Sequence, residues 1–242
     1  MTTGTGPRLL VVEHEPACPP GHLGTWLTDA GAELEVCRPW AGDEVPDLAS
    51  YDALIVLGGS MGANDDATTH WLTPVKDRIR AADVAGLPTL GVCLGHQLVA
   101  VALGGESQPN PLGQQVGLFD IGWTPEAAED DLVAPLATPR RGVQWNADVV
   151  TRLPDDAVVL AATPAGELQV ARFGPATWGV QLHPEVDEPL VRSWAEGDRD
   201  DHLRLGIDQD RALREIDAAR EELDEAWRPL ADRFVELARR AR

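Results

Sequence analysis

The 242-residue chain has little positive charge, few cysteines and few aromatic residues. It carries 20 Lys and Arg against 40 Asp and Glu, a formal net charge of −20. Nucleic acids are bound through clustered Lys and Arg, so we do not expect a nucleic-acid partner for a chain of this charge. The same repulsion argues against an anionic membrane surface. The hydrophobic fraction of 43% is large enough for a sizeable core, which argues against a disordered acidic chain.

Three cysteines, Cys18, Cys37 and Cys93, occur without any Cys-x-x-Cys spacing. An odd number without such spacing does not favour a disulfide framework, and a reducing compartment is expected. The N-terminus MTTGTGPRLLVVEH lacks the apolar stretch of a signal peptide, and no apolar run approaches the length of a membrane span. The sequence therefore predicts a cytoplasmic protein.

The first hundred residues alternate between short apolar runs and helical spacing. Strands are expected over 8–12, 33–37, 53–57 and 88–93, and helices over 22–30, 71–85 and 94–103. The uniformly apolar run 53–57 is typical of a central parallel strand. This alternation predicts an α/β fold, a doubly wound and mostly parallel sheet with helices on both faces. Ligands of such sheets bind at the carboxyl ends of the strands.

The second half of the chain changes character. Short β-like runs at 116–121, 142–145, 157–161, 167–172 and 177–182 predict an antiparallel extension of the same sheet. We predict one domain over 1–195 and a C-terminal helical extension over 196–242 that packs on it. Pro229 is expected to start the second helix of this extension, because proline costs little in a first turn. A partner-docking role for the extension is the alternative.

A candidate nucleophile stands between a predicted strand and a predicted helix. Gly91-Val92-Cys93-Leu94-Gly95 is the cysteine version of a nucleophile elbow. The turn is so sharp that side chains two residues before and after its apex would clash, which accounts for the glycines. The amide groups and dipole of the following helix favour a thiolate. A buried structural cysteine is the alternative, but the glycines and the local context favour a nucleophile.

A nucleophile of this kind needs a base, and His183 is the candidate. It lies in Gln181-Leu182-His183-Pro184-Glu185, after the run 177–180. Residues i and i+2 of an extended chain point to the same side, so His183 and Glu185 can project together. One imidazole nitrogen could then face Cys93 while the carboxylate holds the other. A solvent-facing His-Pro-Glu turn is the alternative when the tripeptide is taken alone.

Acyl transfer also needs two N–H groups for the developing oxyanion. Leu94 supplies one, and the loop Gly58-Gly59-Ser60-Met61-Gly62 is placed to supply the second. The spacing of this loop matches neither a dinucleotide-binding loop nor a P-loop. No metal-binding motif is present in the sequence, and no metal or cofactor is expected.

Together these residues resemble the class I glutamine amidotransferase family. Gly91-Val-Cys-Leu-Gly-His-Gln97 is similar to the family's nucleophile motif, and Val180-Gln-Leu-His-Pro-Glu185 to its histidine–glutamate motif. The resemblance covers about residues 8–190 and implies a flavodoxin-like sheet. Within the family, the Gly58-Gly59-x-Met61 loop is most similar to free-standing GMP synthase-like amidotransferases.

The resemblance implies hydrolysis of the glutamine side-chain amide. Cys93 would attack the amide, His183 would protonate the departing ammonia and activate water, and Glu185 would orient His183. The amides of Gly59 and Leu94 would hold the oxyanion. Substrate contacts would come from Gln97, Gly58, Gln115 and Val116. His96 is not the base in this family and is expected to be structural.

Three positions depart from the family pattern. The family loop is often Gly-Gly-Pro, and here Ser60 replaces the proline. Relatives usually have a glutamate near Gln115, and they often have histidine where Asn146 follows Trp145. The expected partners are L-glutamine and a separate synthetase that takes up the ammonia. One alternative is a stand-alone hydrolase of γ-glutamyl compounds that uses the same three residues. Another is a family member used as a binding module without catalysis.

Overall fold

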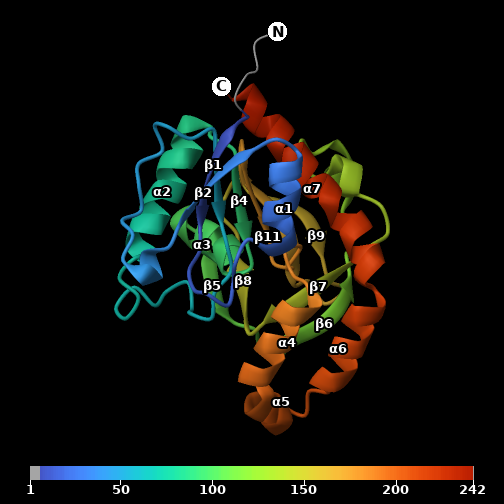
Figure 1. Cartoon of the computed structure of the whole chain (residues 1–242). Coiled ribbons are helices and arrows are strands. Elements are labelled where there is room, and N and C mark those ends of the chain that lie inside the picture. Colours follow the sequence, from blue (N-terminus) through green and yellow to red (C-terminus); the bar gives the residue numbers. More distant parts are fainter. Residues whose placement is uncertain (1–5, 242) are drawn as a thin grey trace.

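The computed structural model describes residues 6–241. Residues 1–5 and residue 242 lie outside the described residues. Residues 1–5 are part of the N-terminus that is expected to lack a signal peptide. A seven-stranded sheet runs through the centre in the order β2-β1-β3-β4-β11-β10-β9 (Figure 1). Its strands are β1 (Arg8–Val12), β2 (Glu33–Cys37), β3 (Ala53–Val56), β4 (Thr89–Val92), β9 (Val158–Ala162), β10 (Leu168–Gly174) and β11 (Thr177–Val180). The first five in this order pair in parallel, which confirms the predicted doubly wound α/β class.

Helices cover both faces of the sheet. The helices α1 (Gly21–Asp29) and α7 (Arg220–Arg240) pack on one face, and α2 (Leu72–Ala85) and α3 (Leu94–Ala102) on the other. The alternation within β1 shows why both faces are apolar. Leu9 and Val11 belong to the core under α1 and α7, while Leu10 and Val12 belong to the core under α2 and α3.

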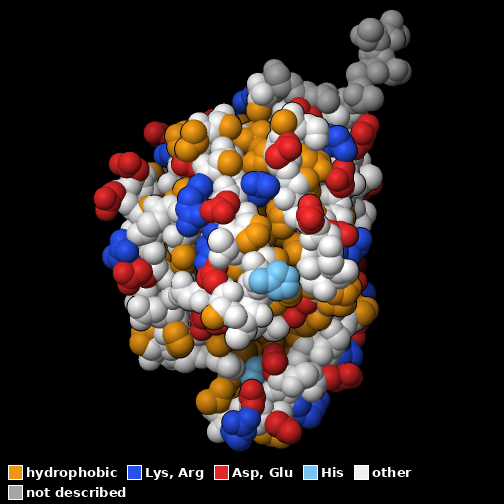
Figure 2. All heavy atoms as spheres, turned by 90° about the vertical axis from the view of Figure 1, so that its left-hand side faces the viewer, with side chains coloured by type: hydrophobic (Ala, Val, Ile, Leu, Met, Phe, Trp, Pro, Cys, Tyr) orange, Lys and Arg blue, Asp and Glu red, His pale blue; other side chains and the backbone are white. Residues whose placement is uncertain are grey.

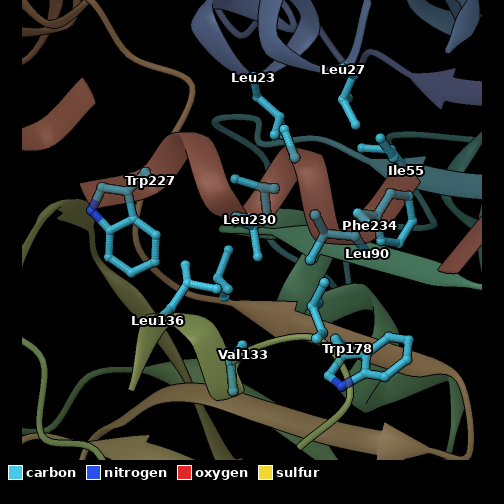
Figure 3. Close-up of a cluster of buried hydrophobic side chains, with 14 of the residues drawn as sticks. Leu23, Leu27, Ile55, Leu90, Val133, Leu136, Trp178, Trp227, Leu230 and Phe234 are labelled. Atoms are coloured by element: carbon cyan, nitrogen blue, oxygen red, sulfur yellow. The ribbon is translucent and has the colours of Figure 1, made fainter. Parts of the chain in front are cut away.

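The long helix α7 corrects one expectation. Pro229 does not start a helix but lies inside α7, which continues from Arg220 to Arg240. A proline inside a helix costs about 3 kcal/mol because it removes a hydrogen bond and crowds the preceding turn. Burial offsets this cost, since Trp227, Leu230 and Phe234 on α7 belong to the buried core on this side of the sheet (Figure 3).

The predicted antiparallel extension is correct only in part. The strands β10 and β9 extend the sheet by antiparallel pairing, but β11 pairs in parallel with β4. The strands β6 (Gln115–Asp120) and β7 (Arg141–Asn146) form a separate two-stranded sheet. The strands β5 (Glu106–Pro109) and β8 (Asp148–Arg152) form another, and the sequence pattern had not predicted either of these two strands. Short strands carry no local signal for their pairing partner, because that choice depends on contacts distant in sequence.

The C-terminal region is helical, as expected. After β11 the chain forms α4 (Glu188–Gly197), α5 (Arg199–Leu205) and α6 (Gln209–Ala218) before α7, while the division at residue 195 stays a prediction. The helices α4, α5 and α6 form the lower end of the molecule in Figure 1. Figure 2 shows a hollow between this lower end and the main body. Within the described residues, short 3-10 helices lie at Pro39–Ala41, Pro125–Glu129 and Ala134–Leu136. Within residues 6–241, no helix combines the length and apolarity needed to cross a bilayer.

Candidate active site

The turn between β4 and α3 holds Cys93 in a strained conformation. Its φ of 50° is the only positive value of a non-glycine residue within residues 6–241. A Cβ on Gly91 would lie 2.4 Å from the carbonyl oxygen of Gly95, and one on Gly95 would lie 1.9 Å from that of Val56. The two glycines are therefore required by the packing of α3 against the strand ends. Strain of this kind is concentrated at functional sites.

His183 and Glu185 project together from the segment after β11. Nδ1 of His183 and Oε1 of Glu185 are 2.6 Å apart, and both side chains are buried. Burial opposes a charged imidazole, but the charges of Cys93 and Glu185 prevail and raise the pKa of His183 well above its ordinary value. Nδ1 faces the carboxylate, which leaves Nε2 as the nitrogen available to Cys93.

Gly58 lies where these side chains converge. A Cβ there would be 3.4 Å from Cε1 of His183 and 3.7 Å from Cβ of Cys93. It would also be 3.7 Å from the sulfur of Cys18. Glycine at this position thus keeps the space between nucleophile and base open.

Two glutamine amides connect Cys93 to the floor of the site. Nε2 of Gln181 donates a hydrogen bond to the Cys93 sulfur at 3.5 Å. Nε2 of Gln97 in turn donates to Oε1 of Gln181 at 3.3 Å. Nε2 of Gln97 also donates to the Asp148 carbonyl at 2.9 Å. This network links α3, β8 and the segment after β11, so the nucleophile sits on a fixed support.

Cys93 and His183 open into a cavity of about 650 Å³. Five carboxylates line it, and among the described residues its lining includes no Lys or Arg; the acidic residues are Glu15, Asp65, Asp148, Asp198 and Asp201. A volume of this size is in the range of small-molecule sites. The cavity therefore suits a ligand that carries hydrogen-bond donors or positive charge.

The C-terminal helices supply one wall of the cavity. The rings of His183 and Trp194 have centroids 4.7 Å apart, and Trp194 Nε1 donates to the Ala17 carbonyl at 2.7 Å. Trp145 packs between Trp194 and His202, and its Nε1 donates to Oδ2 of Asp198 at 2.8 Å. The helical region therefore contacts His183, which is the candidate general base for Cys93.

The expected site residues fall into two groups. Cys93, His183, Gly59, Gln97 and Val116 line the cavity, whereas Gly58, Leu94, Glu185 and Gln115 lie behind its surface. Leu94 opens α3, where N–H groups lack intrahelical acceptors. Gln115 bonds Asn146 instead, because Asn146 Nδ2 donates to its Oε1 at 3.1 Å. His96 points away from the cavity and packs against Phe173, with ring centroids 5.2 Å apart.

Several lining residues escaped the sequence interpretation. Trp194, Asp198 and His202 come from helices whose packing has no local signal, and Cys18 and Glu15 come from the loop after β1. Asp148 follows Asn146, which the sequence did single out, but nothing in the sequence indicated that Asp65 and Asp148 line the same cavity. The three cysteines are free thiols, and no group of three His, Cys, Asp or Glu side chains within residues 6–241 is placed to hold a metal ion.

Comparisons with known proteins agree with this geometry. The family model described as glutamine amidotransferase class-I matches residues 25–189. The chain is 30% identical over 191 residues to the glutamine amidotransferase-like protein YfeJ of Salmonella typhimurium, covering 76% of this chain and 78% of that protein. It is 28% identical over 169 residues to gamma-glutamyl peptidase 4 of Arabidopsis thaliana, covering 68% and 66%.

The chain is also similar to one component of a larger enzyme. The chain is 31% identical over 157 residues to a subunit of the glutamine-hydrolysing GMP synthase of Saccharolobus solfataricus, covering 64% of this chain and 78% of that protein. Among solved structures, a glutamine amidotransferase of Thermotoga maritima superimposes with a TM-score of 0.84 over 96% of this chain and 99% of that one. At 23% identity this likeness supports the fold alone.

Proposed function

Because this chain belongs to the class-I glutamine amidotransferase family, whose members are cysteine-nucleophile amidohydrolases, we propose that it hydrolyses the side-chain amide of glutamine through a thioester on Cys93. One observation carries the proposal. Cys93, held at a positive φ, shares a cavity with His183, which the buried Glu185 orients across 2.6 Å. This is the arrangement of nucleophile, base and orienting carboxylate that covalent acyl transfer requires.

The reaction has two halves. The Cys93 thiolate attacks the amide carbon, and the tetrahedral intermediate collapses as His183 donates a proton to the nitrogen, which leaves as ammonia. His183 then accepts a proton from water, whose oxygen attacks the thioester and releases glutamate and the thiolate. The raised pKa of His183 keeps the imidazolium available for the first proton transfer.

Backbone amides would stabilise the charge that develops on the substrate oxygen. We assign this role to the N–H groups of Gly59, which lines the cavity, and of Leu94, which directly follows Cys93. Removal of one such donor costs about 10²–10³ in kcat in enzymes of this kind. Gln97 and Val116 would contact the glutamyl part of the substrate, whereas Gln115 would act through Asn146 rather than by contact.

The ammonia would pass to an acceptor on a separate synthetase. The similarity to the GMP synthase component of Saccharolobus solfataricus supports this, because that protein is by its name one part of a glutamine-hydrolysing synthase. The second candidate is a stand-alone hydrolase of γ-glutamyl compounds. The cavity volume of about 650 Å³ favours it, since it leaves room beside Trp194 for an amine larger than ammonia.

The test is release of glutamate by the purified chain from L-glutamine and from a panel of γ-glutamyl dipeptides. We expect Cys93-dependent turnover of glutamine, which Cys93→Ala abolishes. Faster turnover of dipeptides than of glutamine would move the protein to the second candidate. Retention of near wild-type hydrolysis in Cys93→Ala would overturn the mechanism.

Glu185 has a test of its own. Glu185→Gln keeps the shape of the side chain but removes its charge, so kcat should fall by about 10²–10⁴, the range of positioned acid–base catalysis. The pKa of His183, followed by NMR, should fall as well, because the Glu185 charge is one of the groups that raises it. An unchanged His183 pKa would contradict the orienting role.

A further inference from the structure

A chain of ring contacts leads from His183 along one wall of the cavity. The ring centroids of His183 and Trp194 are 4.7 Å apart. Trp194 is followed by Trp145 at 6.3 Å, and Trp145 by His202 at 5.3 Å. The four residues line the same cavity as Cys93. In the proposed mechanism His183 protonates the departing nitrogen, so the group attached to that nitrogen would lie against the start of this wall.

His202 has an unused ring nitrogen at the end of this wall. The residue is only 2% exposed, and its Nδ1 lies 2.7 Å from Oε1 of Gln209. An amide oxygen can only accept a hydrogen bond, so Nδ1 carries the hydrogen and Nε2 is an acceptor. Nε2 makes no hydrogen bond within residues 6–241. A buried polar side chain that lines a cavity with an unused acceptor indicates a missing donor.

Asp198 adds a carboxylate beside the same rings. It lies between α4 and α5, and its Oδ2 accepts the Nε1 hydrogen of Trp145 at 2.8 Å. It makes no ion pair in the part of the chain that the structure describes, whereas the neighbouring Asp201 is paired with Arg204. A carboxylate and the face of an indole ring both attract positive charge. This wall therefore suits an ammonium group.

The wall comes from a part of the chain that lies outside the family match. The family model ends at residue 189, whereas Trp194 belongs to α4 and His202 to α5. The described residues that line the cavity include no Lys or Arg, so a leaving amine that carries a carboxylate would find no basic partner there. The C-terminal helices therefore give this cavity a preference of their own for the charge of the leaving group.

We propose that Trp194, Asp198 and His202 form a subsite for the amine part of a γ-glutamyl amide, and that this amine carries a second, protonated amino group, as a short alkyl diamine does. The alkyl chain lies on the indole rings, and Asp198 and Nε2 of His202 bind the far ammonium. The nitrogens of an extended four-carbon diamine are about 6 Å apart. That length is comparable with the 6.3 Å and 5.3 Å between successive rings of the wall.

The assignment rests on the proposed chemistry of Cys93 and deepens the second candidate function. The covalent steps are those given above. The bond that breaks joins the γ-glutamyl carbonyl carbon to one nitrogen of the diamine, and that nitrogen leaves with the proton from His183. Water then hydrolyses the thioester and releases glutamate.

The test measures binding without turnover. In a Cys93→Ala background, calorimetry compares the γ-glutamyl amide of 1,4-diaminobutane with that of pentylamine, which has a methyl group in place of the far ammonium. We expect the diamine compound to bind at least tenfold more tightly, because hydrogen bonds to charged groups are stronger than neutral ones. Asp198→Asn should reduce this ratio to about threefold or less. His202→Phe, which keeps a ring beside Trp145, should reduce it in the same direction.

Asp200→Asn is the matched control. It removes the same unit of charge two residues further along the chain, but Asp200 is exposed on α5 and does not line the cavity. The ligand ratio should stay as in the parent, which separates direct recognition from the overall charge of the protein. An equal loss of ratio in Asp200→Asn would overturn the proposal. So would equal weakening of both ligands by Asp198→Asn, a ratio near one in the parent, or absence of binding by either ligand.

The outcome for the proposed function is read separately. Glutamate release from L-glutamine and from the diamine compound is measured on the chain with Cys93 intact. A ligand ratio that depends on Asp198, together with no Cys93-dependent release from either compound, would leave the leaving-group subsite standing and overturn the hydrolase assignment. Cys93-dependent release with a ligand ratio independent of Asp198 would do the opposite.

Discussion

Gln115 and Asn146 are directly opposite each other on β6 and β7, and their side-chain amides are hydrogen-bonded across 3.1 Å. The family resemblance implies a glutamate near the first position and often a histidine at the second. In this chain the two side chains form one neutral, hydrogen-bonded pair.

This pairing predicts strong coupling between the two positions. Gln115→Glu alone places a carboxylate in a buried site without a cationic partner and should destabilise the fold by about 3–5 kcal/mol. Adding Asn146→His should recover at least half of that loss, because an imidazolium can pair with the new carboxylate. Urea unfolding of both single variants and the double variant gives the coupling energy. Additive effects would show that the two residues do not act as a pair.

The strained turn at Cys93 predicts that the nucleophile costs stability. Cys93→Ala retains a Cβ at a φ of 50°, whereas Cys93→Gly removes it. The glycine variant should therefore be more stable than the alanine variant by about 1 kcal/mol. This difference is what remains of the relieved backbone strain after the larger loss of chain entropy on folding of a glycine. Both variants lack the thiol, so the comparison isolates the backbone. An alanine variant at least as stable as the glycine variant would show that the turn is unstrained.

The three thiols should differ in reactivity toward iodoacetamide. Burial and the carboxylate of Glu15 raise the pKa of Cys18, and burial with Asp43 raises the pKa of Cys37 to about 11. At pH 7.5 both stay protonated, so alkylation followed by peptide mass spectrometry should modify Cys93 first. Activity should disappear in step with the first equivalent. Cys18→Ser serves as the control and should leave the rate of modification at Cys93 unchanged.

Two buried histidines predict a loss of stability in acid. Burial lowers the pKa of His14 to about 4 and that of His96 to about 3. Both are neutral in the folded protein but take up a proton in the unfolded chain below pH 6.5. The stability they contribute is therefore complete above pH 6.5 and is lost as the pH falls toward 3–4.

Urea unfolding at several pH values between 7.5 and 4.5 tests this expectation. The wild-type chain should lose stability steadily over this range, and His96→Asn should show a shallower slope even if it is less stable at pH 7.5. The comparison of slopes removes the contribution of the carboxylates, which both proteins share. Parallel curves would mean that His96 does not take part in the acid transition.

The sequence by itself determined the parts of the molecule that depend on neighbouring residues. The glycines around Cys93 follow from the contacts of a sharp turn, and the approach of Glu185 to His183 follows from their spacing in an extended segment. The strands β1, β3 and β4 were also recognisable, because each carries a mainly apolar run that is buried in the sheet. These features need no knowledge of the distant chain.

Only the tertiary structure decided the rest of the site and the course of α7. The local pattern around Pro229 predicted a helix start, but burial of Trp227 and Phe234 in the core outweighs one lost hydrogen bond. Asp65 and Asp148 are 83 residues apart and meet only because separate segments converge at the carboxyl edge of the sheet. Trp194 reaches His183 because α4 folds back over that edge. Such placements depend on the summed packing of the whole chain, which no local pattern encodes.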